Sequence, residues 1–146
     1  MSIAVTIAMV SVGFVGIKTF NQTIYKSRSC TWANIDNIEL RTLTDIPNTN
    51  ECKCTYSAPA AVKKSAFKLE LSAVEIKEYA VENKFVVVNK PDGGLIQKFE
   101  EVGVDAEALA KGEILQKAAD RPGQESFTLV LHPESKTLLV YLKYYS

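Results

Sequence analysis

The stretch Phe127–Tyr144 reads FTLVLHPESKTLLVYLKY and decides the fold class. Apolar Phe127, Leu129 and Leu131 alternate with their neighbours, which is the period of a strand with one face in a core. The segment His132–Lys136 contains Pro and Ser and is typical of a turn, and an apolar stretch of the same period follows it. The pattern predicts a hairpin of two antiparallel strands at the end of the chain.

Upstream of this hairpin, the residues after Val62 also alternate, and they predict a strand that ends near Leu71. Ser72 and Glu75 follow with the spacing of a capping box, in which each side chain binds the backbone amide of the other residue. Apolar residues then recur with helical spacing. We therefore expect a helix over residues 73–83.

The next segment predicts a second hairpin and a weaker helix. A β-branched run over 85–88 precedes a Pro-Asp-Gly turn signal, and residues 95–102 are expected to form the returning strand. Asp105 is expected to cap a helix that extends to about Ala119. Gly112 weakens that helix, because glycine costs about 1 kcal/mol relative to alanine in a helix interior.

These elements predict an α+β fold with a small antiparallel sheet of about four or five strands and one or two helices packed on it. The sheet domain is expected over residues 62–146, which are enough for a single core. A polar linker over 28–61 and a hydrophobic N-terminal helix over 1–27 are expected to precede it.

Composition excludes several classes of protein. The 146 residues are 47% hydrophobic and 23% charged, with 17 basic and 17 acidic residues, so the formal net charge is +0. Such a chain is hydrophobic enough to fold and has no overall attraction to nucleic acid. The three cysteines and one histidine favour neither a disulfide-rich scaffold nor a histidine-based metal site.

The N-terminal segment differs from the rest of the chain. Met1–Ile17 has no charged side chain, and residues 3–17 have the length of the apolar core of an export signal. We expect an export signal, cleaved or retained. A permanent single-pass anchor and a buried helix or strand of a soluble protein are the alternatives. Residues 3–17 are also the expected site of membrane contact.

The basic residues Lys18, Lys26 and Arg28 follow this segment without any acid before residue 34. The positive-inside rule places that side of the segment in the cytoplasm, which favours an inward-facing anchored protein over an exported one. An exported protein, in the cell envelope or secreted, is nevertheless the main expectation, with an inner-membrane anchor as its variant.

Residues 13–41 carry a resemblance to a known family. The stretch Ile17–Asn21 (IKTFN) and the later stretch Asn37–Arg41 (NIELR), which follows Ala33–Asp36 (ANID), resemble the leader of the NVEALA-type small exported bacterial proteins. Leu40 and Arg41 depart from the alanine and leucine of that motif. The resemblance implies export and implies no activity.

Cys30, Cys52 and Cys54 are the candidate disulfide residues. In an exported protein we expect Cys30 to pair with Cys52 or with Cys54, which leaves one thiol for an intermolecular bond. The alternative is a soft-metal site in which His132 is the fourth ligand. The Cys-x-Cys spacing is not that of common zinc motifs, so no metal and no cofactor is expected.

No catalytic residue is predicted, and the chain is not expected to be an enzyme. His132 is the only side chain whose ordinary pKa is near neutrality, and it is expected in a solvated turn. The acid pairs Glu75/Glu78 and Glu100/Glu101 are expected on solvated faces.

The composition of one surface indicates a binding role. On the final hairpin, the face opposite the core stripe is rich in tyrosine and aliphatic side chains, as interfaces are. Its candidate partner residues are Val130, Leu139, Tyr141 and Tyr145. The alternative is that the linker or the second helix covers this face.

We therefore expect an exported or membrane-tethered interaction domain that binds a protein or a surface glycan, and no nucleic acid. The alternative is a membrane-anchored regulator of the exclusion or immunity-inhibitor type.

Overall fold

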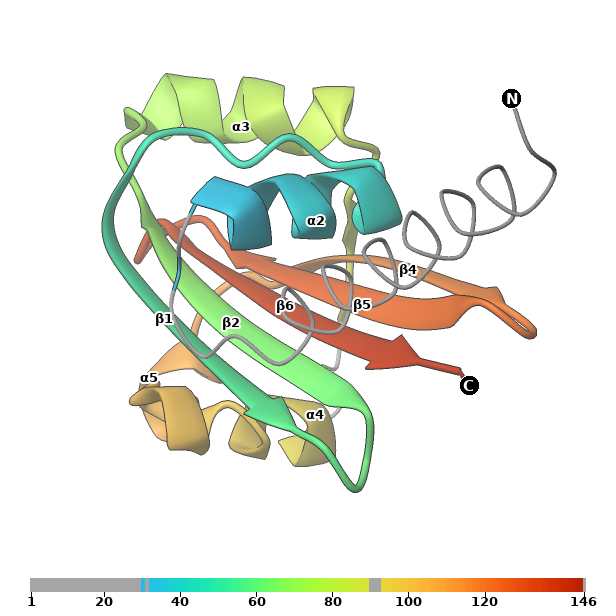
Figure 1. Cartoon of the computed structure of the whole chain (residues 1–146). Coiled ribbons are helices and arrows are strands. Elements are labelled where there is room, and N and C mark those ends of the chain that lie inside the picture. Colours follow the sequence, from blue (N-terminus) through green and yellow to red (C-terminus); the bar gives the residue numbers. More distant parts are fainter. Residues whose placement is uncertain (1–29, 31, 90–92, 146) are drawn as a thin grey trace, which may run out of the picture.

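The computed structural model describes residue 30, residues 32–89 and residues 93–145 (Figure 1). The fold is α+β, as predicted, and its sheet is antiparallel with six strands in the order β1-β2-β6-β5-β4-β3. Helices lie on both faces of the sheet (Figure 1). The hydrophobic helix expected over 1–27 and most of the Pro-Asp-Gly turn lie outside the described residues.

The predicted C-terminal hairpin is confirmed. Strands β5 (Glu125–His132) and β6 (Thr137–Tyr144) pair in antiparallel register, with Leu129 opposite Val140. Lys136 has a φ of 55° in the connecting turn, which gives the chain the left-handed residue that a tight turn requires. These two strands occupy the middle of the sheet, so both of their faces can be covered.

Strand β2 (Val62–Leu69) pairs with β6 on one side and with β1 (Thr49–Ser57) on the other. Strand β1 and helix α2 (Trp32–Thr42) both fall within residues 28–61, where a linker was expected. Strand β1 is an edge strand that pairs with β2, and its alternating residues Cys52, Cys54 and Tyr56 are less apolar than those of the central strands. The folded part of the chain therefore begins well before residue 62.

Helix α3 (Ala73–Glu82) confirms the predicted helix and its capping box. The Glu75 amide donates to the Ser72 hydroxyl oxygen at 3.2 Å, and the Ser72 amide donates to the Glu75 carboxylate at 2.7 Å. The helix buries Ile76, Tyr79 and Ala80, and it connects β2 to β3 (Val86–Val87) at the far edge of the sheet.

The prediction of a returning strand over 95–102 is wrong. This segment forms helix α4 (Gly93–Gln97) and the 3₁₀ helix η1 (Glu100–Val102). Its buried apolar side chains are Leu95, Ile96, Phe99 and Val102, a spacing of three and four residues that suits short helices lying on a sheet.

The second predicted helix begins where expected but is short. Asp105 caps α5 by accepting the Ala108 amide at 3.0 Å, yet α5 (Ala106–Leu109) has only four residues. The segment expected to continue it forms β4 (Leu115–Arg121), which pairs with β5. Pairing along the buried strand β5 therefore overrides the weak helical preference of this segment.

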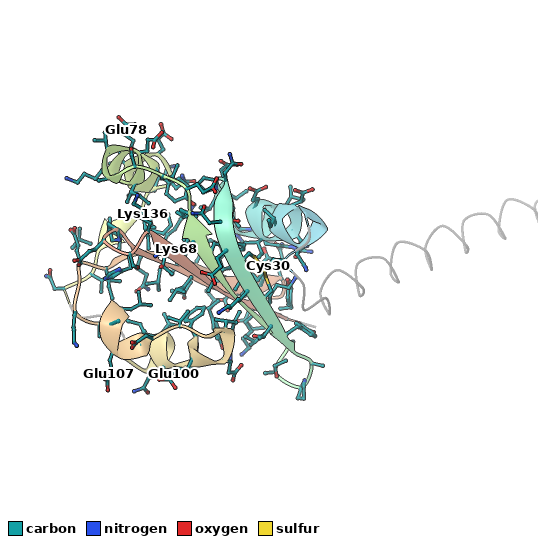
Figure 2. All side chains as sticks on the ribbon, turned by 90° about the vertical axis from the view of Figure 1, so that its left-hand side faces the viewer. Cys30, Lys68, Glu78, Glu100, Glu107 and Lys136 are labelled. Carbon is teal, nitrogen blue, oxygen red and sulfur yellow. A yellow bond between two sulfur atoms is a disulfide. The ribbon has the colours of Figure 1, made fainter. Side chains whose placement is uncertain are left out.

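Two cores lie on opposite faces of the sheet. The first contains Phe67, Leu129 and Val140 together with Ile38 of α2 and Ile76 of α3. The second packs the opposite side chains of the same strands against α4, η1 and α5; its buried members are Leu95, Ile96, Phe99, Val102, Leu109, Ile114, Val130 and Leu139. Figure 2 shows the two helical layers, with Glu78 on one outer surface and Glu100 and Glu107 on the other. The molecule is thus a sheet covered on both sides.

Polar contacts fix α2 on its face of the sheet. The side chain of Lys63 on β2 is fully buried, and its Nζ donates to Asn34 Oδ1 of α2 at 2.6 Å. Burial lowers the pKa of Lys63 to about 8. Glu125, which is buried at the start of β5, accepts from Arg41 at 2.7 Å and from Arg121 at 3.0 Å.

In the part of the chain that the structure describes, no helix has both the length and the apolar character needed to cross a membrane.

Candidate functional site

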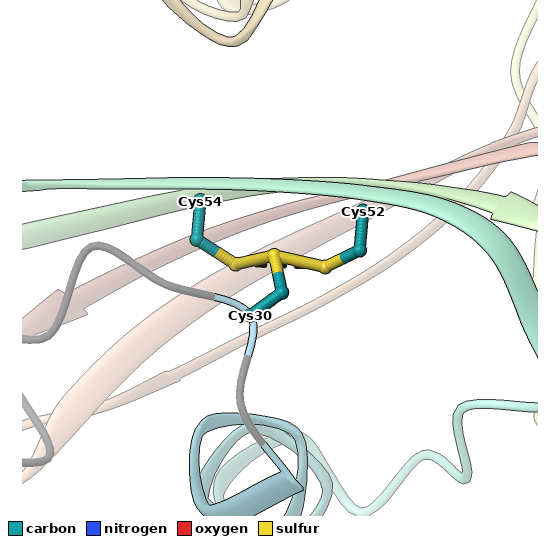
Figure 3. Close-up of side chains that lie close together, drawn as sticks. All are labelled: Cys30, Cys52 and Cys54. Carbon is teal, nitrogen blue, oxygen red and sulfur yellow. Dashed lines mark hydrogen bonds between the residues drawn. A yellow bond between two sulfur atoms is a disulfide. The ribbon is translucent and has the colours of Figure 1, made fainter.

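The three cysteines meet at the edge of the sheet. Cys52 and Cys54 are two residues apart on β1, so their side chains point to the same face of the strand. Cys30 lies just before α2, the helix that packs on this face. The three sulfur atoms lie within 4.8 Å of one another, and Figure 3 shows the Cys30 sulfur between the other two.

Cys30 is within bonding reach of both expected partners. Its Sγ contacts the Sγ of Cys52 and that of Cys54, and the Cα–Cα distances are 6.0 and 5.7 Å. Both distances fall in the range of about 4.4–6.8 Å that disulfides show. Because one sulfur forms only one disulfide bond at a time, the two bonds are alternative pairings, and each leaves one cysteine unpaired.

The two strand cysteines differ in exposure. Cys54 is 8% exposed, whereas Cys52 is partly exposed and packs at the margin of the first core. Their sulfurs are 3.8 Å apart. The unpaired thiol therefore belongs to the buried Cys54 in one pairing and to the partly exposed Cys52 in the other.

His132 does not belong to this cluster. Among the described residues, the group that could hold a metal ion contains the three cysteines and not the histidine proposed as a fourth ligand. Three thiolates at this separation could still hold a soft metal ion.

His132 also differs from the predicted solvated turn residue. It ends β5 and is buried, with its Nδ1 2.7 Å from the Ser135 hydroxyl and accepting the Ser135 amide at 3.1 Å. Burial lowers the pKa of His132 below its usual value, so the ring is neutral at pH 7. Its Nε2 faces Gly112 and has no hydrogen-bond partner among the described residues. The contacts are those of a ring that stabilises the β5–β6 turn.

The predicted partner surface on the final hairpin is largely covered. Val130 and Leu139 are buried in the second core beneath α4, η1 and α5, and Tyr141 packs at its edge under Lys98. The face is apolar because it is a second core. The alternative left open by sequence reasoning was cover by the linker or the second helix; α5 comes from that helix, whereas α4 and η1 come from the segment expected to form a strand. Tyr145 is exposed, and its hydroxyl donates to Asp120 Oδ1 at 3.2 Å and lies at the same distance from the Ser126 hydroxyl.

A different exposed surface lies on α2. Leu40 and Leu43 are 74% and 69% exposed, although α2 buries its other face against the sheet. They line a shallow hollow together with Asp36, Glu39 and Asp45. Sequence reasoning missed this surface because the segment was assigned to a linker. The signal that could have found it was the helical spacing of Ile35, Ile38 and Thr42, which leaves Leu40 on the opposite side.

Leu43 is unusual in its backbone as well. It directly follows α2 and has a φ of 50°, in the left-handed region that normally holds glycine or asparagine at the end of a helix. Its side chain gains little burial there. Neither the core nor the backbone explains a leucine at this position.

Leu43 also borders a second hollow, whose charged lining residues are three bases and the acid Glu82. That hollow lies between the ends of α2 and α3 and strand β4, and its basic lining residues are Lys84, Lys117 and Arg121. Lys117 Nζ donates to the Leu43 carbonyl at 2.8 Å and to the Thr44 hydroxyl at 2.6 Å. The exposed side chain of Leu43 thus lies between a group of acidic residues and a group of basic residues.

No known protein family, curated protein or solved structure matches this chain.

Proposed function

We propose that the chain is an exported or membrane-tethered binding module that docks a protein partner on the exposed side of α2. The observation that carries this proposal is Leu43, an exposed leucine in a left-handed conformation. Strained backbone conformations cluster at functional sites, including positions that hold a ligand.

The chemistry of the surrounding surface favours a protein as the partner. Leu40 and Leu43 supply an aliphatic centre, with acids on one side and bases on the other. An apolar centre inside a polar rim is the composition of protein–protein interfaces. A nucleic acid or an anionic membrane would favour a rim of basic residues alone.

Export is supported by three features. Met1–Ile17 carries no charge, and residues 13–41 resemble the leader of exported NVEALA-type proteins. The pairing of Cys30 with a cysteine of β1 is the third, because disulfides persist in oxidising compartments.

Protease accessibility in intact host cells tests the location. Because the chain is expected outside the cytoplasm, protease added after outer-membrane permeabilisation should degrade it, while a cytoplasmic marker survives. Protection of the chain until the inner membrane is lysed would contradict export and would favour the inward-facing, membrane-anchored regulator.

Site-specific photo-crosslinking in the host tests the docking surface. A photoreactive residue at position 40 is expected to give one discrete covalent adduct with another protein. The same residue at position 74 on α3 is the control, because Val74 is 67% exposed but lies outside this surface. No adduct from position 40, or the same adduct from both positions, would contradict the proposal.

A further inference from the structure

The cysteine cluster contains an odd number of thiols around one central sulfur. Cys30 can bond to Cys52 or to Cys54, and the third cysteine stays unpaired in either case. The fold holds this third sulfur beside the disulfide, because all three lie within 4.8 Å. This is the arrangement that thiol–disulfide exchange requires, a thiol next to a disulfide sulfur.

We propose that the cluster is a thiol–disulfide exchange site whose reactive thiol, Cys52, forms a mixed disulfide with an external disulfide. The proposal does not depend on the docking surface of α2. It assigns the same fold two covalent isomers, in which the unpaired thiol is that of the buried Cys54 or that of the partly exposed Cys52.

The internal step conserves atoms and electrons. In the Cys30–Cys52 isomer, Cys54 loses its proton to solvent and its thiolate attacks the Cys30 sulfur. The Cys30–Cys54 bond forms, the Cys30–Cys52 bond breaks, and Cys52 leaves as a thiolate that solvent can protonate. One disulfide is present before and after the step, so no oxidant is consumed.

The external step needs a disulfide as co-reactant. The Cys52 thiolate attacks one sulfur of a low-molecular-weight disulfide, a mixed disulfide forms at Cys52, and the other half of the reagent leaves as a thiolate. Cys52 is the partly exposed member of the strand pair and lies at the margin of the first core. Cys54 is less suited to this step because its side chain is almost fully buried.

Peptide mapping of the full chain tests the internal step. The protein is purified without reductant, its free thiol is alkylated under native conditions, and it is then digested with trypsin. Cleavage after Arg41, Lys53 and Lys63 places the three cysteines on separate peptides, so each pairing is read directly. We expect both pairings, with the alkyl group on Cys52 whenever Cys30 is bonded to Cys54. A single pairing would overturn the proposal.

Oxidised glutathione is the probe for the external step. The wild-type chain should gain one glutathione, mapped to Cys52, while Cys52→Ser and Cys54→Ser should gain none because neither retains an unpaired thiol. Circular dichroism of the two variants provides the folding control. An unmodified wild-type chain, an adduct on Cys54, or three thiolates holding a stoichiometric metal ion in the purified protein would each overturn the proposal.

Discussion

The backbone at Leu43 makes the docking surface testable through stability. A leucine at a φ of 50° costs about 1–2 kcal/mol relative to an unstrained conformation, and glycine does not pay this cost. Leu43→Gly should therefore raise the free energy of unfolding by about 0.5–1 kcal/mol while it weakens the crosslink from position 40.

Ala61→Gly is the matched control, because Ala61 also has a φ of 50° but lies in the β1–β2 turn. It should relieve the same strain and leave the crosslink unchanged. Denaturant titration measures stability, and adduct yield in cells measures docking. A destabilised Leu43→Gly protein with full adduct yield would contradict the account of Leu43.

Lys63 gives the protein a pH dependence of known sign. Its pKa is about 8 in the folded state and close to 10.5 in the unfolded chain, so the unfolded state binds more protons between these values. Stability therefore rises with pH from about 8 to 10.5 through this group. Lys63→Met should flatten the rise between pH 8 and 10, as measured by denaturant midpoints at each pH. An identical slope in wild type and variant would show that Lys63 is not buried in the folded state.

At the scale of elements, the capping box of α3 is a direct prediction from sequence that the structure confirms. Ser72→Ala removes the hydroxyl that accepts the Glu75 amide and should lower the free energy of unfolding by about 1 kcal/mol. A denaturant midpoint equal to that of the wild type would mean that the helix does not depend on this cap.

Gly112 distinguishes the structure from the helix that the sequence predicted. In a helix interior, Gly112→Ala would stabilise the protein by about 1 kcal/mol. In the structure, a Cβ at this position would overlap Nε2 of the buried His132, so the same change should destabilise by about 1–3 kcal/mol.

The double variant identifies the cause. In a His132→Ala background the clash is absent, and Gly112→Ala should cost much less. Thermal melts of the four proteins complete the cycle. Stabilisation by Gly112→Ala alone would favour the longer helix.

An element was predictable from the sequence when its own residues determine it, and not when it depends on pairing with another strand. The β5–β6 hairpin and α3 were predictable because their own residues carry the period and the cap. Strand β4 was not, because Lys117–Asp120 have little strand preference and depend on pairing with β5. Strand β1 was missed because its alternating Cys52, Cys54 and Tyr56 lie in a segment rich in turn and loop residues, which indicates a linker.

The candidate sites were likewise predictable only in part. The pairing of Cys30 with Cys52 or Cys54 was expected from oxidation in an exported protein. That both strand cysteines lie within reach of Cys30 was not predictable, because their segment was assigned to a linker and the i, i+2 pair shares a face only on a strand. The partner surface on β5 and β6 was misplaced because alternation shows which side chains share a face, and not which faces are covered. Leu139 is apolar because a second helical layer buries it.

At the scale of the whole molecule, Cys30, helix α2 and strand β1 together carry both proposed sites. Helix α2 presents Leu40 and Leu43, and strand β1 presents Cys52 and Cys54. Ile38 and Ile46 of this region belong to the first core, and Arg41 binds the buried Glu125 at 2.7 Å. Both proposals therefore depend on α2 and β1 being part of the folded domain.

Hydrogen exchange of the intact chain, followed by mass spectrometry, tests this central claim most directly. Peptides that cover β1 and α2 are expected to be protected from exchange in the native state. They should exchange at the rate of an unfolded chain only at denaturant concentrations that also unfold β2 and β6. Exchange of residues 32–57 at the unfolded rate under native conditions, with β2 and β6 still protected, would show that this region is a linker and would contradict the account.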